Sequence, residues 1–196
     1  LPEKSAIEGV RRGYASGREV TALIAALTKA GSLKPLSQDL SSQQRRELLA
    51  EVAKRGVIDR GRKIFERKAL ACTTCHLVNN RGGMVGPDLT SVGTYATPES
   101  LLESLLNPSS TIKQGYETAV VTRKDGTSVA GLLQRKTDSA TLVRDPVGKV
   151  IAIPSGEIAR IDRSSVSLMP PGLTAFLRRD ELIDLMRYLT SLGKEP

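Results

Sequence analysis

Large aromatic side chains and metal-binding residue types are both scarce in this chain of 196 residues. It contains no Trp, only 3% aromatic residues, two Cys and one His. A structural zinc site needs about four nitrogen or sulfur ligands, and these three side chains do not supply them. No apolar run approaches the roughly 18–20 residues of a membrane helix, so no membrane span is predicted. The apolar core must also form without large flat side chains.

The chain begins at Leu1, with neither an initiator Met nor a signal peptide, and we therefore expect a mature form or a fragment. Basic residues outnumber acidic ones, which gives a formal net charge of +8. Such a balance favours docking to acidic partners or anionic surfaces, although a solvated basic surface accounts for most of these charges. The basic residues are scattered rather than clustered with aromatic residues, so nucleic-acid binding is not predicted.

All of the Cys and His residues fall in one pentapeptide, Cys72-Thr73-Thr74-Cys75-His76. A Cys-x-x-Cys-His run is the attachment site of a c-type haem, whose vinyl groups react with the two thiols while the histidine binds the iron. A thioredoxin-like pair would need a surrounding βαβ pattern, which is missing, and a disulfide here would close too small a loop to stabilise much. The motif therefore predicts one covalent haem c, and with it export to the periplasm or an outer membrane surface. A porphyrin would also supply the flat group that the core lacks.

Helical periodicity marks both ends of the chain. Apolar residues at i, i+3, i+4 and i+7 from Val20 to Leu27 predict a buried helical face. Ser41-x-x-Gln44 predicts a capping box, so residues 1–56 are expected to form an N-terminal helical segment without chemistry of its own. Further helices are predicted over about 59–68, over 101–106 before Asn107-Pro108, and from an N-cap at Asp180 to Leu192, with Gly193 as the stop.

Between Tyr116 and about Arg163 the hydrophobic period changes to that of strands. Asp125-Gly126 is a strong two-residue hairpin signal. Several short strands joined by tight turns predict a small antiparallel barrel or curled sheet. The predicted strands cover residues 117–124, 127–134, 140–144, 149–153 and 158–161.

The motifs outside the pentapeptide resemble those of a known family. Gly61-x-x-x-Phe65, Gly86-Pro87 and a terminal helix with Tyr188 resemble class I cytochrome c. The chain more closely resembles the haem-binding cytochrome domain first described from planctomycetes and verrucomicrobia. That resemblance covers about residues 57–192 and rests on Gly-Gly-x-x-Gly-Pro-Asp-Leu (82–89), Leu-Leu-Glu-Ser-Leu-Leu-Asn-Pro-Ser (101–109), Gly115-Tyr116, Asp125-Gly126 and Ser-Leu-Met-Pro (167–170).

The resemblance implies a mainly α fold, in which a class I cytochrome c helical core is split by a small antiparallel β insertion. The expected parts are an N-terminal helical segment (1–56), the first part of the core with haem attachment (57–115), the inserted β domain (116–165), and the distal Met loop with the C-terminal helix (166–196). In this family Gly61 permits close packing against the last helix, beside Phe65 and Tyr188. Pro87 would present its carbonyl to the ring N–H of His76 and so orient the ligand.

His76 is the proximal iron ligand by its position in the motif, and without a second histidine a bis-histidine haem is impossible within one molecule. Met169 stands in a proline-rich loop at the family's distal ligand position, whereas the apolar stripe around Met186 predicts a core residue. The open alternatives for the sixth ligand are Met169, Met84, Met186, a lysine, water or no ligand. Candidate partners of the haem propionates are Arg81, Thr94 and Tyr95, in the loop that lines the haem edge in related proteins.

The function predicted from these features is one-electron transfer by a monohaem c-type cytochrome that is not itself an enzyme. The resemblance suggests an electron-accepting module for an exported dehydrogenase, either fused or neighbouring. A haem-based sensor or small-ligand binder with a labile distal ligand is the alternative, and a peroxidase is disfavoured because no distal histidine exists. The β insertion would serve as a docking surface for the partner or as a buttress for the Met169 loop. No oligomeric state is predicted.

Overall fold

The computed structural model describes residues 39–175 and 177–195, together with Ser5, Ala6, Gly9, Ala26, Lys29 and Ala30. The apolar residues of the helix predicted around Val20–Leu27 lie outside the described residues. The chain divides into two compact units, each built from separate stretches of sequence. The helical unit comprises Leu1–Cys72, Ser91–Pro108 and Pro170–Pro196, and the sheet unit comprises Thr73–Thr90 and Ser109–Met169.

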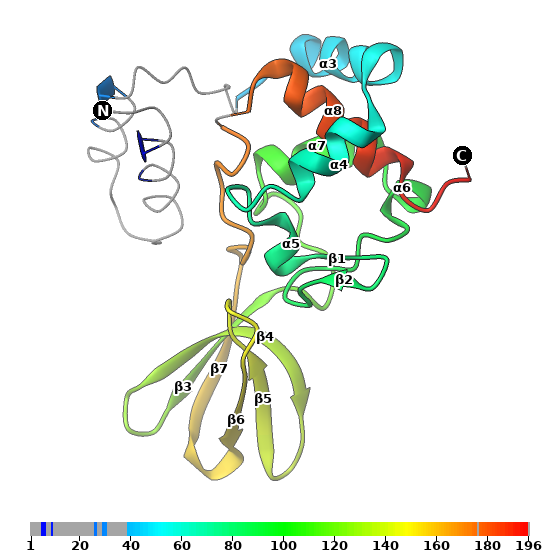
Figure 1. The fold of residues 1–196 in the computed structure, drawn as a ribbon. Helices are drawn as coiled ribbons and strands as arrows, with labels where there is room; N and C mark the ends of the chain where they lie inside the picture. The colour runs from blue at the N-terminus through cyan, green and yellow to red at the C-terminus, as the bar shows by residue number, and fades with distance from the viewer. Residues whose placement is uncertain are drawn as a thin grey trace. The chain divides into compact units, whose positions relative to one another are not determined.

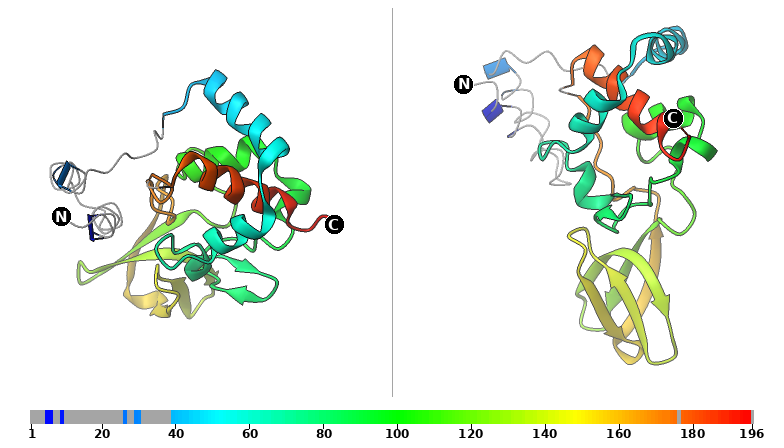
Figure 2. Two further views of the ribbon diagram at one scale, coloured as in Figure 1. Left: turned by 45° about the horizontal axis from the view of Figure 1, so that its top comes forward. Right: turned by 45° about the vertical axis from the view of Figure 1, so that its right-hand side comes forward.

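The helical unit is organised around its last helix. Its elements are α3 (Ser42–Arg55), α4 (Ile58–Phe65), α6 (Val92–Tyr95), α7 (Pro98–Leu106) and α8 (Arg179–Ser191). Helix α8 contacts the other four (Figures 1 and 2) and contributes a fully buried stripe that includes Leu182, Leu185 and Met186. Met186 is therefore a core residue, as predicted. None of the helices in the described part of the chain has the length and hydrophobicity that a membrane span requires.

The helix boundaries follow local hydrogen bonding. The predicted capping box is confirmed at α3, where the side chains of Ser41 and Gln44 each accept a hydrogen bond from the other residue's backbone N–H. The prediction of Asp180 as the N-cap of α8 is wrong, because the helix begins at Arg179 and the cap position is occupied by Arg178, two residues before Asp180. There the carboxylate of Glu181 accepts the Arg178 N–H at 3.0 Å. Gly193 follows the helix with φ +78, in keeping with its predicted role as the stop.

Helices α4 and α8 touch through their backbones. A Cβ on Gly61 would lie 2.0 Å from the carbonyl oxygen of Asp184, so a side chain is excluded at this crossing. The rings of Phe65 and Tyr188 meet beside it with 5.6 Å between their centroids. The buried carboxylate of Asp184 accepts the N–H of Val57 at 2.8 Å and the Arg60 Nε–H at 2.6 Å. This packing of Gly61 matches what the family resemblance implies.

The sheet unit holds a five-stranded antiparallel sheet in the order β6-β5-β4-β3-β7 (Figure 1). Each of the five predicted strands is present, and Gly126, with φ +87, forms the predicted turn between β3 and β4. Val121, Val143 and Ile153 form a buried cluster of the sheet's own. The strands are β3 (Thr118–Arg123), β4 (Ser128–Lys136), β5 (Ala140–Arg144), β6 (Val150–Pro154) and β7 (Ile158–Ser164), with a 3-10 turn η1 (Ser155–Glu157) before β7.

The predicted mainly α fold class is wrong. Of the residues that the structure describes, 38% are in helices and 22% in strands, so the fold is a mixture of α and β. The reason is that the alternating pattern from β3 to β7 builds a complete sheet with a core, whereas the helices are short, the longest described one having 14 residues.

Candidate haem-attachment site

The two cysteines stand at the ends of a single helical turn, α5 (Cys72–Cys75). Neither is part of a disulfide and both are half-buried, and burial raises the pKa of the Cys75 thiol. Ala71, immediately before the turn, has φ +55 in the left-handed region, which is uncommon for a residue other than glycine and separates α5 from the preceding residues. One short element therefore presents both thiols, with His76 directly after it.

His76 has one ring nitrogen engaged and one available. Its Nδ1 lies 2.8 Å from the carbonyl oxygen of Pro87. Because a carbonyl can only accept, Nδ1 carries the proton and donates it, which leaves the Nε2 lone pair for a ligand. Burial lowers the pKa of His76, while the bond to Pro87 opposes that change. The ring is thus held neutral and oriented, which is the form in which imidazole binds a metal.

A loop wraps back over the motif and satisfies its carbonyl groups. The N–H of Gly83 donates to the carbonyl of Thr73 at 2.9 Å, and that of Gly86 to Cys75 at 2.7 Å. The N–H of Leu89 then donates to Leu77 at 2.9 Å. Two short strands, β1 (Leu77–Val78) and β2 (Arg81–Gly82), pair between these contacts. The motif and the loop therefore form one closed backbone arrangement.

The glycines of this loop are required by close approach to the motif. A Cβ on Gly86 would lie 2.5 Å from Cε1 of the His76 ring. A Cβ on Gly83 would lie 1.9 Å from the carbonyl oxygen of Thr74, and one on Gly82 would lie 2.1 Å from that of His76. The three glycines of Gly-Gly-x-x-Gly-Pro thus allow the loop backbone to lie directly against the backbone and the imidazole of the motif. The proline that follows supplies the carbonyl that orients the ring.

The three methionines occupy different environments. Met84 is 62% exposed, and Met186 is fully buried in α8. Met169 is half-buried and belongs to the sheet unit, as does His76. Its N–H donates to the Ser167 hydroxyl at 3.1 Å, and the Ser167 N–H donates to the Ser109 hydroxyl at 3.1 Å. The Met169 segment is therefore tied to the stretch that leads into the sheet.

The remaining predicted haem-pocket residues are divided between the units. Gly61, Phe65 and Tyr188 lie at the α4–α8 crossing of the helical unit. Arg81 is an exposed residue of β2 in the sheet unit. Thr94 and Tyr95 lie in α6 of the helical unit, with Tyr95 57% exposed. Sequence reasoning did not single out Arg144 of β5, because the strand pattern alone does not reveal the surroundings of an arginine.

The donor set fits a covalent haem c. Two thiols outside any disulfide and one imidazole stand within five residues, and the Nδ1 atom of that imidazole is held by the carbonyl of Pro87. Within the described part of the chain, no group of three or more His, Cys, Asp or Glu side chains is arranged to hold a metal ion. In comparisons with known proteins, no family model and no curated protein matches this chain.

Proposed function

We propose that this chain is a monohaem c-type cytochrome that transfers single electrons. The observation that supports this most strongly is the bond from His76 Nδ1–H to the Pro87 carbonyl at 2.8 Å, next to two cysteine thiols on one helical turn. A bound haem would supply an iron that alternates between the ferric and ferrous states. The polypeptide supplies attachment, orientation and burial.

Each residue of the site has a defined task in this proposal. Cys72 and Cys75 hold the haem through thioether bonds, and His76 Nε2 is the proximal ligand. The bond to Pro87 fixes the ring plane and increases the electron donation of the imidazole. Gly86 leaves the space that the ring occupies. The half-buried position of His76 limits the access of water to its ring.

We propose Met169 as the sixth ligand. Met84 is exposed and Met186 is fixed in the core of the helical unit, whereas Met169 is half-buried in the sheet unit. Thioether ligation raises the reduction potential relative to ligation by two nitrogens. Such a potential suits a protein that accepts electrons from an exported dehydrogenase, and the net charge of +8 favours an acidic docking surface on that partner.

The test uses protein produced together with a haem-attachment system. The ferric wild type should show a weak sulfur-to-iron absorption band in the far red at neutral pH, and Met169→Ala should lose it. The matched control Met84→Ala should retain the band, because Met84 is exposed. A high-spin ferric wild type, or carbon monoxide binding to the reduced wild type, would indicate an open iron and favour the haem-based sensor.

A further inference from the structure

Two half-buried arginines of the sheet, Arg123 and Arg144, have different partners. The Nε–H of Arg123 also has no hydrogen-bond acceptor, but Arg123 lies 3.7 Å from the carboxylate of Glu157, which pairs with its charge. Arg144 instead donates to two neutral acceptors, the Gly148 carbonyl at 3.3 Å and the Gln134 side chain at 3.1 Å. Among the described residues, Arg144 makes no ion pair, and its buried Nε–H has no hydrogen-bond acceptor. A buried charged donor without an acceptor destabilises the folded state. An anion that accepted a hydrogen bond from this guanidinium would remove that cost.

Arg144 stands at the end of the sheet where the chain enters and leaves it. The strand register aligns Arg144 with Leu132 and Val150, and Leu132 with Thr118, which in turn pairs with Ser164. The segment that leads to Met169 begins directly after that end. Arg123 lies at the opposite end, where β3 meets the start of β7.

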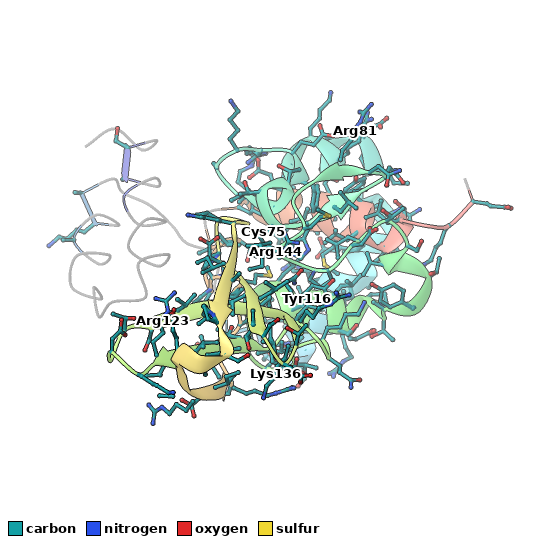
Figure 3. The ribbon with its side chains drawn as sticks, turned by 90° about the horizontal axis from the view of Figure 1, so that it is seen from below. Cys75, Arg81, Tyr116, Arg123, Lys136 and Arg144 are labelled. Atoms are coloured by element: carbon teal, nitrogen blue, oxygen red, sulfur yellow. The ribbon has the colours of Figure 1, made fainter. Side chains whose placement is uncertain are left out.

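The turn after Arg144 approaches the loop that holds the proximal histidine. A Cβ on Gly148 would lie 3.7 Å from Cγ2 of Val85, a buried residue. Val85 is followed by Gly86, whose backbone lies against the His76 ring. Figure 1 shows the β5–β6 turn at the end of the sheet nearer α5, and Figure 3 labels Arg144, Cys75 and Arg123 in the view from below.

We propose that Arg144 binds a carboxylate of the attached haem. This inference rests on the proposed function and extends it, because it assigns the inserted sheet a part in cofactor binding. A guanidinium presents a planar fork of N–H donors that matches a carboxylate with two hydrogen bonds. A haem propionate at this position gives the Nε–H of Arg144 its acceptor and neutralises the arginine's charge.

The pairing has a measurable electrochemical consequence. An adjacent guanidinium keeps a carboxylate ionised down to low pH. Without it, the propionate is protonated at acidic pH and ionised at higher pH, where its negative charge stabilises ferric iron. The midpoint potential should then fall as pH rises. The neighbouring charged groups at this end of the sheet, Asp145, Lys149, Glu117 and Arg163, are unchanged in the variants below.

The experiment compares the midpoint potentials of matured wild type, Arg144→Gln, Arg144→Lys and the control Arg123→Gln between about pH 5 and about pH 8. Wild type and Arg123→Gln should give nearly flat profiles. Arg144→Gln should show a potential that falls with rising pH, and Arg144→Lys should restore most of the flat profile. Absorption spectra recorded on the same samples establish that the haem is attached and that its axial ligands are unchanged.

Each other outcome has a defined meaning. A flat profile for Arg144→Gln with a normal spectrum overturns the proposal and leaves the cytochrome assignment standing. A wild type without attached haem overturns both. Equal changes in Arg123→Gln and Arg144→Gln would show a general effect of the sheet and refute the specific contact. If Arg144→Gln does not mature, a mature Arg144→Lys with a flat profile supports the contact, whereas failure of that charge-retaining variant counts against it.

Discussion

The His76 ring is positioned by the backbone of two neighbouring residues rather than by their side chains. The Pro87 carbonyl accepts the Nδ1–H at 2.8 Å, and the bare Cα of Gly86 lies against the ring. A backbone acceptor in a closed loop cannot rotate away as a side chain can. Such an arrangement fixes the imidazole plane before any ligand binds, which reduces the ordering cost of coordination.

Replacing Gly86 with Ala adds a single carbon atom next to the His76 ring and so tests this arrangement. The new Cβ would lie 2.5 Å from the ring, so either the imidazole or the loop must move and the bond to Pro87 weakens. We expect a higher midpoint potential, because weaker donation from the imidazole stabilises ferric iron less. The measurement is voltammetry of the matured variant beside Gly156→Ala, since a Cβ on Gly156 meets nothing within 4 Å. Equal potentials in the two variants would contradict the account.

Single residues differed in how far the sequence alone could place them. The proposed roles of Cys72, Cys75 and His76 come from the sequence alone, because attachment chemistry specifies the residue types and their spacing. The contacts of Gly82 and Gly83 with the motif depend on how the loop folds back, which spacing does not reveal. Arg144 gave no signal, since its unmet hydrogen bond arises from the packing around β5.

The elements of the helical unit depend on the approach of α4 to α8. Gly61 brings the two backbones into contact, and Asp184 on α8 accepts hydrogen bonds from Val57 and Arg60 at the start of α4. The Asp184 side chain is only 4% exposed, whereas that of Arg60 is 61% exposed. The contribution of Asp184 therefore comes mainly from the hydrogen bonds that its own buried carboxylate accepts, with the ion pair partly screened by water.

Gly61→Ala should destabilise the protein although alanine favours helices. The gain in helix propensity is about 1 kcal/mol, but a Cβ located 2.0 Å from a carbonyl oxygen of α8 forces the helices apart. Overpacking of this kind costs about 1–3 kcal/mol or more, so the clash should dominate. Urea unfolding would show a lower free energy of unfolding for Gly61→Ala, while Gly156→Ala stays within about 0.5 kcal/mol of wild type. Equal stability of all three proteins would refute the close crossing.

Elements with a clear periodic pattern were the ones that the sequence predicted. The five strands alternate and are joined by turn residues such as Asp125-Gly126, so their existence followed from the pattern. Helix α6 and the strands β1 and β2 were not predicted, because two to four residues are too few to show a period. The N-cap error at Asp180 arose because the Glu181 side chain caps the helix from within, so that no capping side chain at Arg178 is needed.

At the scale of the whole molecule, the predicted fold class was wrong because it underestimated the share of residues in strands. The resemblance emphasises a helical cytochrome core, but strands, most of them in the inserted segment, make up 22% of the described residues against 38% in helices. The segments that form each compact unit are far apart in sequence, and residues 73–90 group with the sheet although they precede it by many residues. Such grouping depends on tertiary contacts, which local patterns do not encode.

The most direct test of the central claim is the intact mass of the denatured protein after production with a haem-attachment system. The wild type should be heavier than its polypeptide by one haem that acidic organic solvent does not extract. The Cys72→Ser/Cys75→Ser double variant should have the mass of the polypeptide alone. An unmodified wild type, in cells that mature a known c-type cytochrome in parallel, would contradict the assignment of this chain as a c-type cytochrome.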